Sequence, residues 1–274
     1  MHININHIRI VEIEQEIKES PTVKTFIFKD PISHRSKPGQ FLMVWIPRVE
    51  ELPMSVMFSS KSDYSAITIR KHGIGSTKLF CKKPGDILGI RGPYGNSFRV
   101  IKNTHKNVML VGGGTGLVPL IRLADFLKRD NIKYTLIIGA RTRDEILFYN
   151  LAKQLVTNTQ NKIIVTTEDG SFGIKGRVTD GILDIVKKEN FDMIYTCGPE
   201  LMMKNIFMIS SNYSIPAQAS LERYMKCGIG ICASCCIDDK IVCTDGTIFD
   251  QKQLSKMSEF GKFFRDKSGR KCRY

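Results

Sequence analysis

Four cysteines near residue 230 have a spacing that suits iron–sulfur chemistry. The segment Lys226–Cys243 reads KCGIGICASCCIDDKIVC and places Cys227, Cys232, Cys235 and Cys243 at C-x4-C-x2-C-x7-C. The opening C-x4-C-x2-C is the plant-type 2Fe–2S pattern, in which thiolates converge on two iron atoms. A zinc site, usually built from two close cysteine pairs, and disulfides are the alternatives. We predict that these four cysteines ligate a 2Fe–2S cluster and that Cys236 does not.

A glycine-rich segment predicts a second site, for a pyridine nucleotide. In VMLVGGGTGLVPL (Val108–Leu120), an apolar strand pattern is followed by Gly112, Gly113, Gly114, Thr115 and Gly116. Glycine backbone can approach a pyrophosphate closely, and a following helix contributes partial positive charge from its N-terminus. A tight turn between strand and helix is the alternative reading.

Two later strand ends would share the carboxyl edge of a parallel sheet with this loop. One carries Arg141, which can pair with a phosphate. The other carries Cys197, Gly198 and Pro199. Cys197 would lie beside a nicotinamide, or it is a buried core thiol.

Two strings in the first hundred residues suit an anionic cofactor. Leu52–Val56 begins a predicted strand, and Ile69–Lys78 ends one in a glycine turn. The second string combines small residues, hydroxyls and backbone N–H groups with basic side chains, which together can hold an anion. It is equally consistent with an ordinary turn.

Periodicity divides the chain into four parts. Residues 1–103 predict an antiparallel β-barrel, because six short β-rich runs follow one another without long helices. They lie at His7–Ile17, Val23–Phe28, Gln40–Ile46, Met54–Ser59, Ala66–Arg70 and Asp86–Arg91. Residues 104–215 alternate strand and helix patterns and predict a doubly wound parallel sheet. Residues 216–250 are expected to form a small cluster lobe, and residues 251–274 a basic tail, partly disordered or packed as a short helix.

In the second part we expect four strands and four helices. The strands are Asn107–Val111, Tyr134–Gly139, Lys162–Thr167 and Met193–Cys197. The helices are Thr115–Lys128, Asp144–Val156, Val178–Lys187 and Pro199–Ser210.

Charge and cysteine usage bound the cellular setting and the partners. The net charge is +14, and the tail carries eight Lys or Arg residues against two acidic ones. Without a recognition helix or an aromatic–basic motif, this charge favours a solvated basic surface over nucleic-acid binding. The sequence shows no basic-then-apolar leader and no apolar stretch long enough for a bilayer. We expect a reducing, cytoplasmic setting, with no membrane and no nucleic acid.

Five motifs, in order along the chain, resemble those of the ferredoxin-reductase-like flavoproteins. They are GPYGNSF, VGGGTGLVPL, GARTRDEILFY, YTCGPELMM and SLERYMKCGIGICASC. Within that family the chain is most similar, over residues 5–250, to the electron-transfer subunits of heteromeric, NAD-linked dihydroorotate dehydrogenases. The resemblance implies FAD between barrel and nucleotide domain, NAD at the parallel sheet, and a 2Fe–2S cluster in the C-terminal lobe.

The resemblance also assigns residues. It gives flavin contacts to Pro53, Met54, Ser55, Val56, Ile69, Arg70 and Lys71. It gives a phosphate-binding turn to Gly75, Ser76 and Thr77. Leu52 stands where the family usually has an arginine, so a fixed partner of the FAD pyrophosphate is missing. This leaves open whether the flavin is FAD or FMN. Arg70, Lys71 or Lys78 could supply the positive charge in place of that arginine.

These parts predict an electron-transfer oxidoreductase subunit. A nicotinamide exchanges two electrons at once, a cluster exchanges one, and a flavin connects them. The resemblance implies an FMN-containing dihydroorotate dehydrogenase catalytic subunit as partner, in a heterotetramer with two copies of each, serving pyrimidine biosynthesis. We expect no catalytic acid–base residue in this chain. The alternatives are an NAD(P)H-linked subunit of a ferredoxin reductase, sulfide dehydrogenase or hydrogenase and, in another class, a zinc-bearing basic adaptor that binds nucleic acid.

Overall fold

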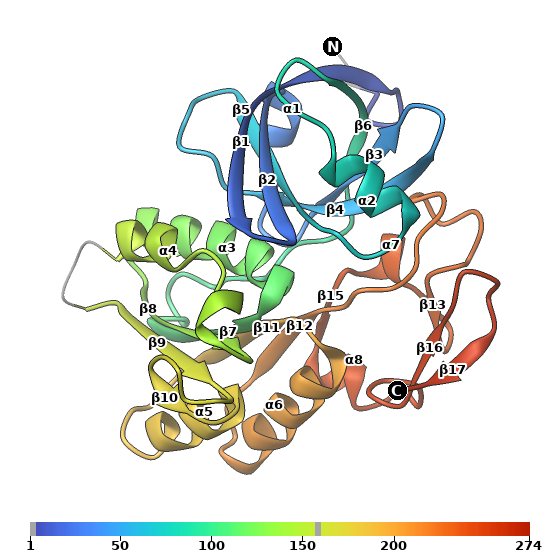
Figure 1. The fold of residues 1–274 in the computed structure, drawn as a ribbon. Coiled ribbons are helices and arrows are strands. Elements are labelled where there is room, and N and C mark those ends of the chain that lie inside the picture. The colour runs from blue at the N-terminus through green and yellow to red at the C-terminus, as the bar shows by residue number, and fades with distance from the viewer. Residues whose placement is uncertain (1–3, 157–159) are drawn as a thin grey trace.

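A β-barrel, an α/β layer and a C-terminal region beside them make up the molecule. The computed structural model describes residues 4–156 and 160–274. Figure 1 shows the barrel in blue and cyan at the top, the α/β layer in green to orange below it, and the last residues in red at one side. The predicted fold class, a barrel followed by a doubly wound sheet and a small C-terminal region, is confirmed.

The six predicted strands close into an antiparallel barrel in the order β1-β2-β5-β4-β3-β6. Their bounds are β1 (Arg9–Ser20), β2 (Val23–Lys29), β3 (Phe41–Ile46), β4 (Glu50–Met57), β5 (Tyr64–Arg70) and β6 (Ile87–Tyr94). Alternate side chains along these strands, such as Phe26 and Phe28 on β2, point inward and are completely buried. This apolar filling holds the barrel closed.

Strands β4 and β5 of the barrel pair over only part of their length. These two strands pair only at Val56 with Ile67 and at Met57 with Ala66. The preceding part of β4 still pairs with β3, through contacts such as Met43 with Pro53. The other edge of this part of β4 does not pair with β5. Pro53 has no N–H to donate, and such a residue is tolerated at an unpaired edge.

Two short helices lie within the barrel sequence, α1 (Pro31–His34) and α2 (Ile74–Phe80). The expected glycine turn at Gly75–Thr77 is therefore the first turn of α2. The Ser76 hydroxyl accepts hydrogen bonds from the N–H groups of His72 and Gly73, and Leu79 is buried against the barrel. Seven residues give too few helical repeats for the sequence pattern to reveal this helix.

The α/β layer is a seven-stranded sheet in the order β10-β9-β8-β7-β11-β12-β15. The strands are β7 (Asn107–Gly113), β8 (Lys133–Ala140), β9 (Lys162–Thr167), β10 (Ile174–Lys175), β11 (Met193–Cys197), β12 (Ala217–Ser220) and β15 (Ile248–Asp250). All neighbours are parallel except β15, which pairs antiparallel with β12. The region expected as a separate lobe at 216–250 thus supplies β12 and β15 to this sheet, while the predicted division into domains stays a prediction.

Helices cover both faces of the sheet. They are α3 (Leu117–Arg129), α4 (Tyr149–Leu155), α5 (Val178–Val186) and α6 (Glu200–Asn212), with 3₁₀ turns η1 (Gly114–Gly116) and η2 (Arg143–Glu145). Val108 and Leu110 of β7 pack in the cluster of α3 and α4, whereas Met109 and Val111 pack in that of α5 and α6. This alternation along one strand is what a doubly wound sheet requires.

The predicted helix at Asp144–Val156 is shorter than expected. It is split into η2 and α4, and Phe148 between them has a φ of +60°. A non-glycine residue in this left-handed region interrupts a helix. No helix within residues 4–156 and 160–274 has the length and apolar character that crossing a membrane demands.

The basic tail is largely folded, which the sequence pattern did not predict. After α8 (Gln251–Leu254), β16 (Phe263–Arg265) and β17 (Lys271–Arg273) form an antiparallel hairpin. Phe260 packs edge-on against Phe207 of α6, with ring centroids 5.8 Å apart. The rest of the cysteine region contains the small pair β13 (Cys236–Ile237) and β14 (Lys240–Ile241), followed by α7 (Val242–Asp245). Strands of two or three residues are too short to show a period in the sequence.

Candidate functional site

A cavity of about 870 Å³ lies at the carboxyl edge of the parallel sheet, where the sequence predicted a nucleotide site. Strands β7, β8 and β11 end there, and their loops supply its walls. Predicted residues on the wall are Gly113, Gly114, Thr115, Gly116, Arg141, Gly198 and Pro199. A dinucleotide-sized cavity at this edge is where doubly wound sheets bind such ligands.

The predicted glycines differ in whether they pack against other protein atoms or face the cavity. A Cβ on Gly116 would lie 2.5 Å from the Cα of Gly198, and one on Gly112 would lie 2.6 Å from Leu120 Cδ1. These two glycines are needed for close packing inside the protein. Gly114 has a φ of +57° and faces the cavity, where a Cβ would meet only Arg70 Nη2, at 3.2 Å. The tight-turn reading therefore fits Gly112 and Gly116, whereas Gly114 stays a predicted nucleotide contact.

Cys197 and Arg141 differ in what they offer to a ligand. Cys197 is 1% exposed and does not line the cavity, and burial raises the pKa of its thiol well above the ordinary value. Arg141 lines the cavity, but its guanidinium makes two hydrogen bonds to Glu145, of 2.9 and 2.6 Å. Cys197 lies behind the cavity wall and does not contact the cavity. Arg141 would bind a phosphate only by giving up its hydrogen bonds to Glu145.

A second cavity, of about 240 Å³, lies between the barrel and the α/β layer. It opens where β4 leaves β5, so Pro53, Met54 and Ser55 form one wall. The opposite wall comes from the start of α3 and from the segment after β12, through residues such as Thr115 and Leu221. A flat ring system would lie here between the two domains.

Among the other predicted flavin residues, Arg70 lines this cavity and the rest do not. Val56 and Ile69 are buried in the barrel core, and Lys71 points to solvent. Around α2, the Glu50 side chain fills the space beside Gly75. Ser76 and Thr77 are half-buried in the same helical turn.

Arg70 stands between the two cavities and lines both. Its guanidinium makes no hydrogen bond or ion pair with any residue in the described part of the chain. An unpaired guanidinium next to Gly114 is suited to a phosphate or pyrophosphate group. Leu52, in contrast, packs against the barrel core. The charge that the family pattern places at position 52 is thus available here from Arg70.

Glu222 is a wall residue of both cavities that the motif analysis missed. Its side chain is open to the cavities, yet the surrounding protein desolvates it. This desolvation raises the pKa of its carboxyl, and the positive charge of Arg70 opposes the shift. The residue lies in SLERYMKCG, one of the quoted motifs, so its sequence position was visible but its place in the cavity was not.

The cysteine loop brings the four predicted ligands together in two pairs. The N–H of Cys232 donates to Cys227 Sγ at 3.5 Å, and the N–H of Cys243 donates to Cys235 Sγ at 3.4 Å. In the described ranges, no three His, Cys, Asp or Glu side chains surround one point as the ligands of a single ion would. A 2Fe–2S cluster instead needs two thiolates for each of two irons, and the paired arrangement suits it.

Backbone conformation turns donors toward the sulfurs. Gly228 and Gly230 have φ values of +73° and +82°, and the N–H of Gly230 donates to Cys243 Sγ at 3.2 Å. Burial alone would raise the pKa of Cys232, but hydrogen bonds from Ser234 and Cys227 lower it to about 6. Burial raises the pKa of Cys243 to about 12, so iron would have to displace its proton. These donors and thiols fit a cluster of the predicted type.

Cys236, the fifth cysteine of this loop, has a hydrogen-bond partner outside the loop. Arg265 of β16 donates from Nε to Cys236 Sγ at 2.9 Å. This contact with the folded tail fits the prediction that Cys236 is not a ligand.

The cysteine loop adjoins the smaller cavity, the one between the barrel and the α/β layer. Met225, which lines that cavity, precedes Cys227 by two residues. Arg91 of β6 donates to the carbonyl oxygen of Cys227 at 3.0 Å, and a Cβ on Gly228 would lie 2.6 Å from Met43 Cγ. Close packing against the barrel therefore fixes the start of the loop.

Comparison with known families agrees with this geometry. Residues 110–207 match the oxidoreductase NAD-binding domain, and residues 222–255 match the iron–sulfur cluster binding domain of dihydroorotate dehydrogenase B. The structure is similar to that of an NADH-dependent reduced ferredoxin-NADP oxidoreductase involved in flavin-based electron bifurcation. That likeness has a TM-score of 0.79 and 29% identity, and it covers 89% of each chain.

Two archaeal relatives are similar over nearly their whole length. The protein of Methanocaldococcus jannaschii is 44% identical over 97% of this chain and 98% of its own. That of Methanothermobacter thermautotrophicus is 40% identical over 98% of each. Both are named "Probable dihydroorotate dehydrogenase B (NAD(+)), electron transfer subunit". With the barrel, the nucleotide cavity and the paired cysteines in place, the chain belongs to the family of dihydroorotate dehydrogenase B electron transfer subunits.

Proposed function

We propose that this chain carries electrons between NAD and a partner subunit that oxidises dihydroorotate. NAD would bind in the larger cavity, FAD in the cavity below the barrel, and a 2Fe–2S cluster in the cysteine loop. Bound FAD would supply the step between two-electron exchange with the nicotinamide and one-electron exchange with the cluster.

The observation that carries the proposal is the shared wall between the sites. Arg70, Thr115 and Glu222 line both cavities, so a ligand in one would adjoin a ligand in the other. Met225 continues the wall of the smaller cavity toward the cysteine loop. The three proposed sites would therefore lie in the order that electrons between NAD and a cluster follow.

The residues of the chain would bind and orient rather than exchange protons with an organic substrate. Gly113 and Gly114 would let the nucleotide pyrophosphate approach the backbone, and Arg70 would neutralise phosphate charge. The free edge of β4 at Pro53–Ser55 would offer backbone groups to the flavin ring. The residues Val56, Ile69, Lys71, Gly75, Ser76 and Thr77 stay predicted flavin contacts, and the first two would act through their backbone.

The partner proposed is an FMN-containing catalytic subunit in a heterotetramer with two of each chain. Cys232 is exposed, and the neighbouring Ile231 is 79% exposed. This tip of the cysteine loop would bring a cluster close to a docked protein. The eight free cysteines suit the reducing, cytoplasmic setting that we propose with it.

Co-expression with the catalytic subunit of the same organism tests the proposal. The purified complex should contain FAD, FMN and two irons per copy of this chain, and dihydroorotate should reduce added NAD. Extraction and chromatography of the flavins would decide between FAD and FMN in this subunit. A complex with all cofactors that oxidises dihydroorotate with quinones but never with NAD would contradict the proposal.

A second candidate is an NAD(P)H-linked ferredoxin reductase subunit. It is favoured by the structural likeness to the reduced ferredoxin-NADP oxidoreductase. The same preparation, tested with reduced ferredoxin in place of dihydroorotate, separates the two. Reduction of NAD by ferredoxin alone would support this second function.

A further inference from the structure

The hairpin at the end of the chain reaches the nucleotide cavity. Tyr274 follows β17, and its side chain lines the cavity beside Glu200 and Glu222. Its ring lies 5.1 Å from that of Phe264 and the residue is 46% exposed, so an aromatic surface faces the cavity. The basic tail thus takes part in a site from which the sequence analysis had left it out.

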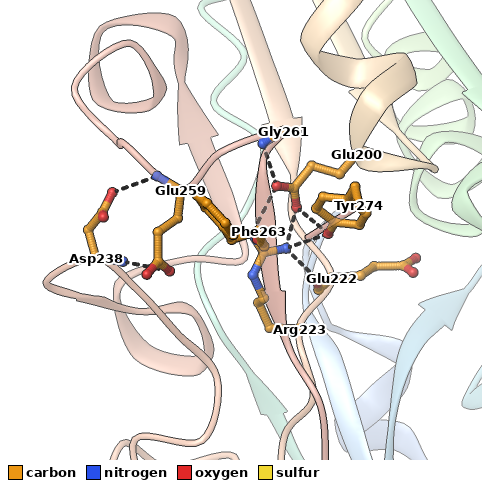
Figure 2. Close-up of polar contacts among 8 residues, drawn as sticks. All are labelled: Glu200, Glu222, Arg223, Asp238, Glu259, Gly261, Phe263 and Tyr274. Atoms are coloured by element: carbon orange, nitrogen blue, oxygen red, sulfur yellow. Dashed lines mark hydrogen bonds and ion pairs between the residues drawn. The ribbon is translucent and has the colours of Figure 1, made fainter. Parts of the chain in front are cut away.

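A buried ion pair fixes the phenol of Tyr274. Its hydroxyl donates to Glu200 Oε2 at 3.0 Å and accepts from Arg223 Nη1 at 3.3 Å, as Figure 2 shows. The side chains of Glu200 and Arg223 are only 4% and 2% exposed and pair through both carboxylate oxygens. The N–H of Gly261, at the base of the hairpin, donates to Glu200 Oε1 at 2.7 Å. Burial raises the pKa of Tyr274 to about 12, so the hydroxyl keeps its proton for Glu200 at neutral pH.

A second set of contacts docks the same segment on the cysteine loop. Glu259 accepts from the N–H of Asp238 at 3.4 Å, and its own N–H donates to the Asp238 carboxylate at 3.3 Å. Arg265 and Lys271 both pair with Glu259, at 3.1 and 2.8 Å. Figure 2 shows Asp238 and Glu259 on one side of Phe263, and Glu200 with Tyr274 on the other. Anchored at both ends, the hairpin holds Tyr274 as a fixed wall.

The strand order assigns this wall to one half of a dinucleotide. Arg141 and Glu168, at the ends of β8 and β9, line the cavity on one side of the β7 glycine loop. Tyr274 contacts Glu200, which follows β11 on the other side of that loop. Glu222 lines the cavity on the same side and also lines the smaller cavity between the barrel and the α/β layer. A dinucleotide whose pyrophosphate lies at the glycine loop would place its nicotinamide half on this second side.

We propose that Tyr274 is a positioning residue for the nicotinamide half of the pyridine nucleotide. This inference rests on the proposed nucleotide site. The ring forms the wall against the nicotinamide riboside, and the Glu200–Arg223 pair sets the angle of the ring through the hydroxyl. Neither ion-pair residue needs to touch the ligand.

Substitution of Tyr274 in the flavin-loaded, full-length protein tests the inference with two ligands. NADH contains the nicotinamide, whereas ADP-ribose lacks it. Tyr274→Ala should raise the Kd and the KM for NADH about three- to tenfold, the loss of one aromatic contact, with kcat for flavin reduction unchanged. Its Kd for ADP-ribose should stay within about twofold. Tyr274→Phe, which keeps the ring, should recover most of the NADH affinity.

Tyr213→Ala is the matched control, because Tyr213 is a 37% exposed tyrosine at the opposite end of α6. Flavin content and iron content should equal those of the parent in all three variants. Equal loss of NADH and ADP-ribose affinity in Tyr274→Ala would overturn the assignment to the nicotinamide half. Unchanged NADH affinity would overturn the role of Tyr274 altogether. Failure of the parent protein to bind either ligand would instead reject the nucleotide site itself.

Discussion

Arg122 of α3 donates two hydrogen bonds to the carbonyl oxygen of Ser36 in the barrel, of 3.1 Å from Nε and 2.6 Å from Nη2. The same guanidinium reaches the carbonyl oxygens of Met57 and His34 at 3.1 and 2.7 Å. It is a charged group buried between the two domains, and this burial lowers its pKa to about 10. Because Val118 of α3 lines the smaller cavity, Arg122 connects the helix that carries one of its walls to the barrel.

We expect Arg122→Met to lower the free energy of unfolding by roughly 2–4 kcal/mol, because three buried carbonyl oxygens lose their donor. Lys128→Met, on the same helix, removes only an exposed 3.4 Å hydrogen bond to the Gln154 carbonyl oxygen and should change it by less than about 0.5 kcal/mol. Chemical denaturation of both variants measures the difference. Equal stability of the two would mean that Arg122 does not hold the domains together.

Replacing any one of Cys227, Cys232, Cys235 and Cys243 by serine should remove the 2Fe–2S cluster, because each iron then lacks a thiolate. Cys236→Ser is the matched control and should keep the cluster, since Arg265 occupies that thiol. Iron analysis and visible absorbance give the result. A colourless Cys236→Ser protein beside a coloured Cys235→Ser protein would reverse the assignment of these two residues.

Gly114→Val should weaken NADH binding by about tenfold or more, because Gly114 has a φ of +57° and faces the cavity and Arg70. Gly85→Val places the same side chain at a φ of +91° in open space and should leave NADH binding unchanged. Rapid-mixing measurement of flavin reduction against NADH concentration compares them. If both variants bind NADH like the parent, the nucleotide does not approach the glycine loop.

Arg70→Ala should weaken flavin binding by roughly 10- to 100-fold, the loss of one charge-assisted hydrogen bond to phosphate. Lys71→Ala should weaken it by a smaller factor, of about threefold, because Lys71 is exposed and lines neither cavity. Titration of the apoprotein with FAD provides both constants. A larger loss in Lys71→Ala would place the pyrophosphate outside the wall formed by Arg70.

His105 should make the stability of the protein depend on pH. It is 3% exposed, its Nδ1 accepts from the N–H of Ile101 at 3.2 Å, and it lies 2.9 Å from the Tyr195 hydroxyl. Burial lowers the pKa of His105, the charge of Asp192 opposes this shift, and the charge of Arg99 adds to it. The folded protein therefore favours neutral His105 more than the unfolded chain does. The stability that this preference adds is complete above the unfolded pKa of about 6.5 and is lost as the pH falls toward the folded pKa.

The free energy of unfolding, measured from pH 7.5 downward, should therefore fall less steeply in His105→Gln than in the parent. His34→Gln serves as control, because the His34 ring is only partly buried and its Nδ1 faces the Tyr64 carbonyl oxygen. Parallel curves for the parent and His105→Gln would show that His105 is not responsible.

The sequence alone determined the features that depend on neighbouring residues. The cysteine spacing follows from the reach of a short loop around two irons, and the glycines of Gly112–Gly116 follow from a strand that must turn into a helix. The six barrel strands and the alternating second half follow from periods of hydrophobicity within single elements. These signals need no knowledge of what lies across the fold.

Only the tertiary structure decided which side chains meet. Arg70 lines two cavities because β4 separates from β5. Cys197 is buried because its side chain packs in the apolar cluster that β11 shares with β7 and α3. Glu222, Arg122 and Tyr274 acquire their places from elements far away in the chain. The hairpin β16–β17 is stabilised by Glu200 and Asp238, not by a pattern of its own. Burial and pairing of this kind depend on contacts between distant segments, which the order of residues does not display locally.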